Sequence, residues 1–279
     1  MSDKNGLPED DILLFDEEEA DIGQPKTGNL KRTPHTRFPF IQTDIDLVLV
    51  IDCTGGKRFL NELKEHAGTL YQKFVDYFAT KNRTVHTFRV RVVAFRDYYS
   101  DWADPDNPPM TESGFFTLPD EREEFAAFLN ELNACGGEDE PKSALEALHL
   151  AFRSPWNVDP AIRKRRQIVA LFTDASAHPL DDPMRYDPEF NLRYPEGMPE
   201  DLEALCEEYM SPEVFPADDH GYPTGHRLVL FAPEKMYPWD KMSDWDACIM
   251  ESVEPNSGLC DLTLEDVFEI LTLPLHLHL

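Results

Sequence analysis

Residues 46–56 read DLVLVIDCTGG, and this stretch decides the expected fold. The apolar run at 47–51 is typical of a central strand that is buried on both faces of a sheet. Asp52 ends the run, and apolar residues then recur at spacings of three and four through 60–77. That spacing predicts an amphipathic helix of about five turns. A strand that leads directly into a long helix indicates a βα unit.

The same alternation of strand and helix patterns continues along the chain. Further strands are expected at 88–95, 115–118, 168–173 and 228–232. Further helices are expected after Pro119, after Pro141, at 200–210 and at 262–271, the last capped by Thr263. Strands that alternate with helices imply an α/β fold with a mainly parallel central sheet of about six strands, flanked by helices on both faces.

Composition divides the chain into two parts. Residues 1–43 carry an acidic and then a basic stretch without sustained periodicity, which predicts a flexible N-terminal arm. Its apolar patch at 12–15 is either a docking peptide or part of a transiently ordered tail. Residues 44–279 form the expected domain. Within it, the segment at about 176–226 is rich in Pro, Asp and Glu and exceeds an ordinary connection of about 2–6 residues, so we expect an insertion.

Charge and cysteine usage exclude several classes of partner. The chain has 26 basic and 54 acidic residues, a net charge of -28 that opposes binding to nucleic acid or anionic membranes. A basic protein surface, bound cations or a simply solvated acidic surface all fit this charge. The five cysteines are scattered without a CxxC pattern, and the N-terminus lacks the pattern of a secretory signal. We therefore expect a cytoplasmic protein.

Three predicted loops concentrate oxygen ligands. They read DCTGG at 52–56, CGGEDEP at 135–141 and TDASAH at 173–178. The first and third follow predicted strands, and ligands of such sheets bind outside the carboxyl ends of the strands. Mg²⁺ prefers hard oxygen ligands in a near-octahedral shell, and glycines such as Gly55 and Gly137 let loop backbones crowd a small ion. The sequence therefore predicts a metal site at this edge.

Taken together, the loops resemble the three motifs of the von Willebrand factor A-type (vWA) domain and its metal-ion-dependent adhesion site. The second loop is similar to the Gly-Gly-x-Asp-x-Pro version of a branch with hemicentin-like and kinase-associated bacterial members. The likeness covers about residues 44–180 well. It implies that the metal ligands, some acting through water, are Asp52, Thr54, Asp139 and Asp174. The implied ion is Mg²⁺, or else Mn²⁺ or Ca²⁺.

The chain departs from this family pattern at two positions. Gly56 stands where the family expects a second hydroxyl, and Lys142 stands where this branch often has Glu. Lys57 and Lys142 also bring positive charge near the loops. These departures leave open a weakened or water-completed metal site, or a vestigial site that keeps the fold without metal.

For each of four further residues near the loops, the sequence leaves two alternative roles open. Asp97 follows the strand at 88–95 and either orients ligands from outside the coordination shell or caps a turn. His178 either hydrogen-bonds a loop carboxylate or is simply solvated. Cys53 and Cys135 flank the hard-ligand loops, where they are either soft ligands that favour zinc or small buried side chains.

The leading functional hypothesis is a binding module rather than an enzyme. The ion would leave one coordination position open for an Asp or Glu of a partner protein, and it would locally invert the charge that otherwise repels that carboxylate. The resemblance implies protein partners in a signalling or assembly complex, such as a kinase, a phosphatase or an ATPase encoded nearby.

Two alternatives remain open from the sequence. Residues 52–55 resemble the Asp-Lys-Thr-Gly of haloacid-dehalogenase-like ATPases, which suggests phosphoryl transfer through Asp52. That family gives no purpose to the Gly-Gly-x-Asp-x-Pro loop. The other alternative is an interaction protein whose acidic insertion and tail bind a partner without any metal.

Overall fold

The computed structural model describes residues 42–54, 57–80, 84–100, 105–136, 140–158, 164–187, 194–215, 225–257, 259 and 261–271. Its strands are β1 (Gln42–Asp52), β2 (Thr84–Phe95), β3 (Met110–Glu112), β4 (Phe116–Leu118), β5 (Arg165–Phe172), β6 (His226–Ala232) and β7 (Cys248–Ser252). Its helices are α1 (Lys57–His66), α2 (Leu70–Thr80), α3 (Arg122–Glu131), α4 (Ala144–Phe152), α6 (Leu202–Tyr209), α7 (Trp239–Met242) and α8 (Leu264–Leu271). Two short 3₁₀ helices are η1 (Ala67–Thr69) and η2 (Pro183–Tyr186).

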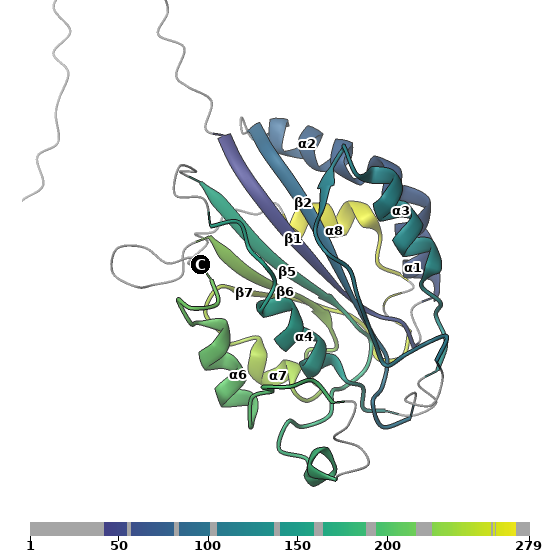
Figure 1. The fold of residues 1–279 in the computed structure, drawn as a ribbon, viewed down its shortest axis with the longest axis vertical. Coiled ribbons are helices and arrows are strands. Elements are labelled where there is room, and N and C mark those ends of the chain that lie inside the picture. The colour runs from purple at the N-terminus through teal and green to yellow at the C-terminus, as the bar shows by residue number, and fades with distance from the viewer. Residues whose placement is uncertain are drawn as a thin grey trace, which may run out of the picture. The chain divides into compact units, whose positions relative to one another are not determined.

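The described strands form one seven-stranded sheet in the order β3-β2-β1-β5-β6-β7, and β4 also pairs with β2 (Figure 1). β1, β2, β5, β6 and β7 are parallel, whereas the short β3 and β4 run antiparallel to β2. The predicted α/β fold with a mainly parallel sheet is therefore confirmed. The sequence patterns did not predict β3 and β7.

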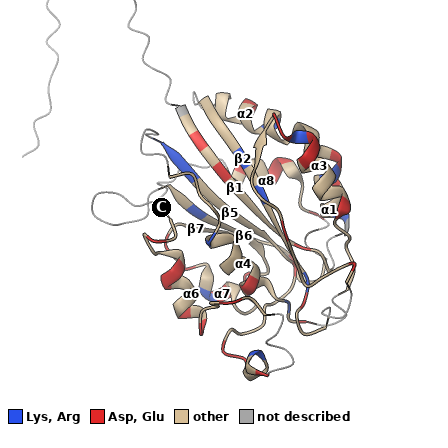
Figure 2. Ribbon diagram, viewed as in Figure 1, with Lys and Arg blue, Asp and Glu red and all other residues tan. Residues whose placement is uncertain are grey.

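The strands begin earlier than their apolar runs because the charged residues before those runs are paired. Asp46 of β1 accepts hydrogen bonds from Arg89 of β2 at Nε and Nη2, at 2.7 and 2.6 Å. Figure 2 shows Lys and Arg residues at the start of β5, where Arg165 and Arg166 stand. The charged residues thus extend the sheet at the amino ends of the strands, and the apolar runs fill its middle.

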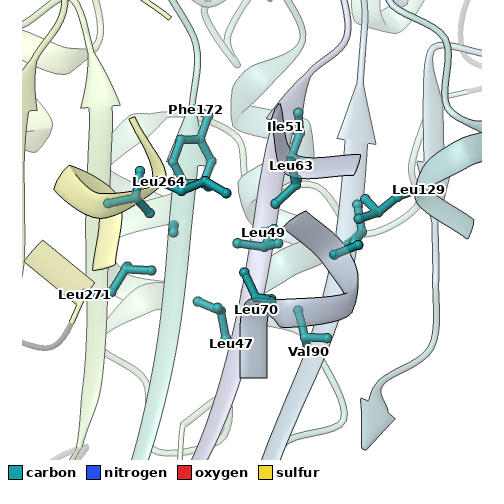
Figure 3. Close-up of a cluster of buried hydrophobic side chains, with 14 of the residues drawn as sticks. Leu47, Leu49, Ile51, Leu63, Leu70, Val90, Leu129, Phe172, Leu264 and Leu271 are labelled. Carbon is teal, nitrogen blue, oxygen red and sulfur yellow. The ribbon is translucent and has the colours of Figure 1, made fainter. Parts of the chain in front are cut away.

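The buried core lies on both faces of the sheet. Successive side chains of a strand point to opposite faces, so Leu47, Leu49 and Ile51 join one cluster while Val48 and Val50 join another. Helices α1, α2, α3 and α8 cover the first face. Figure 3 shows Leu63 and Leu70 next to β1, with Leu264 to one side near Phe172 of β5 and Leu129 to the other. Helices α4, α6 and α7 cover the second face. The continuous apolar run was therefore a correct sign of burial on both faces.

The predicted helix at 60–77 is two helices joined by the η1 turn. Gly68 disfavours helix by about 1 kcal/mol relative to alanine, and the Thr69 hydroxyl donates to the carbonyl of His66 at 3.1 Å. A 3₁₀ turn has three residues per turn instead of 3.6, so it rotates the following helix. As a result Phe78, rather than Tyr77, lies buried in α2.

The segment between β5 and β6 contains η2 and α6, the latter close to the helix expected at 200–210. Glu208 of α6 accepts from His149 Nδ1 of α4 at 2.8 Å and also pairs with Arg153. The expected N-terminal arm and its patch at 12–15 lie outside the described residues, apart from Gln42 and Thr43, which belong to β1. Among the described helices, none is long and apolar enough to span a membrane.

Candidate metal centre

Asp52 is the last residue of β1 and is 1% exposed. Its Oδ1 accepts hydrogen bonds from the backbone N–H and the hydroxyl of Thr54, at 2.8 and 2.6 Å. Its Oδ2 accepts from the hydroxyl of Thr173 at 2.7 Å. Each carboxylate oxygen has about two acceptor positions. Counting the bonds of the described residues, both positions of Oδ1 are used by Thr54, and Oδ2 keeps one position for a cation or a water.

Thr54 presents its hydroxyl oxygen in a way that suits a cation. The hydroxyl proton is directed to Asp52 Oδ1, so the lone pairs of the oxygen point away from that carboxylate. An oxygen held like this accepts a metal ion or a water without giving up its own hydrogen bond. The family likeness assigned the same role to Thr54.

Asp174 lies in the loop that follows β5, the strand next to β1. Burial, the negative charge of Asp52 and the negative charge of Glu140 raise the pKa of the Asp174 carboxyl to about 6. Burial also raises the pKa of Asp52, although hydrogen bonds from Thr54 and Thr173 and the charge of Lys142 offset part of that effect. The two carboxylates are close enough to repel each other, and a bound cation would relieve that repulsion.

The two described ends of the second loop are held against the other two loops. At one end, the N–H of Cys135 donates to the carbonyl of Cys53 at 2.8 Å. At the other end, Lys142 N–H donates to the Ser176 carbonyl and His178 N–H donates to the Lys142 carbonyl, both at 2.9 Å. Four predicted site residues lie outside the described residues: Gly55, Gly56, Gly137 and Asp139.

Asp97 makes the contacts of a turn cap and also contacts His178, whereas the role of orienting a metal ligand stays a prediction. Its Oδ1 accepts from the N–H of Tyr99 and its Oδ2 accepts from the hydroxyl of Ser100, each at 3.0 Å, as in a turn cap. The Nε2 atom of His178 lies 3.1 Å from Asp97 Oδ1, and the His178 ring stacks on Tyr99 at 3.8 Å. Asp97 thus connects the end of β2 to the third loop, and His178 is paired rather than simply solvated.

Two residues that contribute to this arrangement were not predicted. Thr173 joins the first and third loops through Asp52, as described above. Ser143 accepts from the N–H of Tyr98 at 3.0 Å and donates to Asp97 Oδ1 at 3.4 Å. Thr173 is the first residue of the predicted third loop, although no role was assigned to it, and Ser143 lies two residues after the second loop; a hydroxyl in or near a loop motif is the signal that could have drawn attention to them.

The described donors suit a hard cation rather than zinc. Asp52, Asp174 and Thr54 offer oxygen atoms only, which is the ligand preference of Mg²⁺, Mn²⁺ and Ca²⁺. Burial raises the pKa of the Cys53 thiol to about 12, which fits a small buried side chain and not a thiolate ligand. Within the described ranges, no three His, Cys, Asp or Glu side chains gather as a complete metal site. Asp139, the remaining predicted ligand, lies outside these ranges.

Comparisons with known proteins add little to this geometry. No family model and no curated protein matches the chain. Two structures of proximal thread matrix protein 1 from the mussel byssus are 12% and 11% identical, with TM-scores of 0.38 and 0.37 over 82% of this chain. The pilus adhesin SpaC from Lactobacillus rhamnosus GG is 13% identical over 48% of this chain, with a TM-score of 0.31. The matches cover 48% and 47% of the mussel chain and 16% of the adhesin.

Proposed function

We propose that the protein is a metal-dependent protein-binding module and a divergent vWA-type domain. A divalent cation, Mg²⁺ or else Mn²⁺ or Ca²⁺, would be held by Asp52, Thr54 and Asp174 together with Asp139. The observation that carries the proposal is the meeting of two buried carboxylates, Asp52 and Asp174, at the carboxyl edge of β1 and β5 beside an oriented hydroxyl.

Each of the proposed ligands offers a different oxygen atom to the cation. Asp52 offers the remaining position of Oδ2, Thr54 offers its hydroxyl lone pairs, and Asp174 offers a carboxylate whose burial is costly without a counter-charge. A bound divalent ion would supply an open coordination position for the carboxylate of a partner. The partner is a protein of a cytoplasmic signalling or assembly complex, such as a kinase, a phosphatase or an ATPase.

The test measures metal binding and partner capture in the same variants. Titration calorimetry with Mg²⁺ and Mn²⁺ is expected to show at least a tenfold loss of affinity in Asp52→Asn and in Asp174→Asn. Asp120→Asn, which changes an exposed carboxylate before α3, is the matched control and should bind like the native chain. Capture of a partner from native lysate should disappear with chelator. If Asp52→Asn keeps both metal affinity and capture, the proposal is wrong.

The phosphoryl-transfer alternative makes a different demand on Asp52. A nucleophilic carboxylate needs an oxygen that a phosphate can reach, whereas Asp52 is 1% exposed and both of its oxygens accept hydrogen bonds. We therefore propose no enzymatic activity. Magnesium-dependent hydrolysis of p-nitrophenyl phosphate that is lost in Asp52→Asn would support the alternative instead.

One observation favours the metal-independent alternative as a second candidate. Three large hydrophobic side chains of the described residues are exposed, and two of them, Met184 and Tyr186, share the turn η2. Arg185 between them is buried and donates to the carbonyls of Pro199 and Leu180, so the turn is held in place. In the double variant Met184→Ser/Tyr186→Ser, loss of partner capture with unchanged metal affinity would support this candidate.

A further inference from the structure

Lys142 occupies an unusual position for a lysine. Its side chain is 3% exposed, although lysines are almost never fully buried unless their charge is compensated. Its backbone N–H and carbonyl are both bonded to the third loop, at Ser176 and His178. These two bonds fix the point from which the side chain starts, between the second and third loops.

The surroundings of Lys142 are rich in negative charge. The positive charge of Lys142 acts on the carboxylate of Asp52. The negative charges of Asp52 and Glu140 in turn act on Asp174. The hydroxyl of Ser176, whose carbonyl accepts from Lys142, donates to Glu140 Oε2 at 3.3 Å. Lys142 is therefore a buried cation that acts on Asp52, next to a loop whose Asp174 is also influenced by the exposed Glu140.

We propose that Lys142 is a built-in counter-cation of this centre: its buried ammonium group compensates the Asp52 carboxylate in the metal-free protein and opposes the binding of a divalent ion. The proposal builds on the proposed metal function and specifies how the site is regulated by its own residues. Like charges at close range in a poorly solvated site repel each other strongly. The native chain is therefore a weak metal binder that keeps its loops assembled without metal.

Two consequences separate this role from simple packing. Removing the ammonium should strengthen metal binding, because the ion no longer meets a positive charge. It should also destabilise the metal-free protein, because Asp52 loses its compensating charge. A residue that only fills space would lower stability equally with and without metal.

The first experiment uses the full chain and the metal ion alone. In Lys142→Met, calorimetry with Mn²⁺ and Mg²⁺ should show at least tenfold tighter binding than in the native chain. The melting temperature should fall in chelator, and the increase produced by saturating Mg²⁺ should be larger than in the native chain. Arg227→Met removes another buried cation, at the opposite end of the strands in β6, and should lower the melting temperature equally in chelator and in Mg²⁺.

The second experiment needs no metal and so keeps the two proposals distinguishable. In chelator, the double variant Lys142→Met/Asp52→Asn should be more stable than Lys142→Met alone, because removing Asp52 removes the charge that Lys142 compensates. Additive losses in this cycle would overturn the counter-cation role. If the cycle shows coupling but neither the native chain nor Lys142→Met binds metal, the counter-cation stands and the metal function fails. If Lys142→Met binds Mn²⁺, but with the same affinity as the native chain or a lower one, then Lys142 does not oppose the ion and that part of the proposal is wrong.

Discussion

At the scale of the residue, Asp174 links the chemistry of the centre to stability. The pKa of Asp174 in the folded protein, about 6, lies above the ordinary value of 3.8 because of burial and the charges of Asp52 and Glu140. A carboxyl whose folded pKa is raised binds its proton more tightly in the folded state, so stability falls as pH rises from about 4 through 6. Above pH 6 the folded protein bears the full free-energy cost of keeping the Asp174 carboxyl ionised.

We predict that Asp174→Asn stabilises the metal-free protein at pH 8. The shift corresponds to at most about 3 kcal/mol, and screening by solvent reduces the expected gain to about 1–2 kcal/mol. At pH 5, in the middle of the window from about pH 4 to 6, the gain should be about half as large, because the folded carboxyl is then protonated while the unfolded one is still ionised. Urea unfolding in chelator at the two pH values measures both numbers. A variant less stable than the native chain at pH 8 would contradict the prediction.

The pKa of Asp97 is shifted in the opposite direction to that of Asp174. Burial alone would raise its pKa, but hydrogen bonds from His178 and the N–H of Tyr99 outweigh that effect and lower the pKa below 3.8. Its stabilising contribution is therefore present above pH 4 and is lost as pH falls through the lowered value. Asp97 is thus a charged, positioning residue that joins the end of β2 to the third loop and to Ser143 before α4.

We predict that Asp97→Ala destabilises the protein by about 2–4 kcal/mol at pH 7, because it leaves buried partners such as His178 and Ser143 without their acceptor. Asp97→Asn should lose less, since its amide oxygen can still accept from Tyr99. Urea unfolding measures stability, and Mn²⁺ calorimetry should show weaker binding in Asp97→Ala. An effect below 0.5 kcal/mol, as expected for the exposed control Asp120→Ala, would refute the positioning role.

Patterns in the sequence predicted the positions of some residues of the candidate metal centre but not of others. Asp52 and Asp174 end apolar runs, so a parallel sheet puts them at one edge without knowledge of any contact. The bond from Thr173 to Asp52 depends on β5 lying next to β1, and hydrophobic periodicity carries no information on strand order. The contact between Ser143 and Asp97 depends on the path of the loop before α4, which begins three residues after Pro141.

At the scale of the element, helix α4 is anchored to the segment before α6 by a buried acid. Glu146 is fully buried, and its Oε1 accepts from the hydroxyl of Tyr194 at 2.6 Å. Among the described residues its Oε2 has no hydrogen-bond partner, and burial raises the pKa of the carboxyl above 4.5. Because the folded pKa is raised, stability decreases as pH rises through that value.

We predict that Glu146→Gln raises the melting temperature at pH 8 and flattens its dependence on pH between 5 and 8. The neutral amide keeps the acceptor for Tyr194 and removes the buried charge, a gain of roughly 1 kcal/mol or 2–4 °C for a protein of this size. Tyr194→Phe, in contrast, should lower the melting temperature at every pH, because it removes only the hydrogen bond. Thermal scans at four pH values compare the variants, and an unchanged slope in Glu146→Gln would contradict the prediction.

Strands and helices were predictable from the sequence where a single hydrophobic pattern extended over a long segment. The apolar runs of β1, β5 and β6 are buried on both faces and were found directly. β7, with the sequence CIMES, lies at the edge of the sheet and is partly exposed, so it has no continuous apolar run. β3 has only three residues, two of them polar. Their pairing with β6 and β2 is a tertiary effect that local patterns do not encode.

At the scale of the whole molecule, the net charge of -28 opposes the folded state. Figure 2 shows acidic residues spread over helices and loops rather than gathered in one place. Such charges repel one another over distances comparable with the Debye length, about 10 Å at 0.1 M salt. A divalent ion at the centre would act on top of this general repulsion.

We predict that sodium chloride between 20 and 300 mM raises the melting temperature of the native chain by screening. At matched ionic strength, Mg²⁺ at about 100 times its dissociation constant should add about 2.7 kcal/mol, or roughly 5–10 °C. The addition should be absent in Asp52→Asn, whereas the sodium effect should remain. Calorimetric scans in matched NaCl and MgCl₂ separate the two contributions. If Mg²⁺ acts no more strongly than sodium at equal ionic strength, or acts equally on Asp52→Asn, the ion affects only the diffuse charge of the surface and not the loops at Asp52 and Asp174.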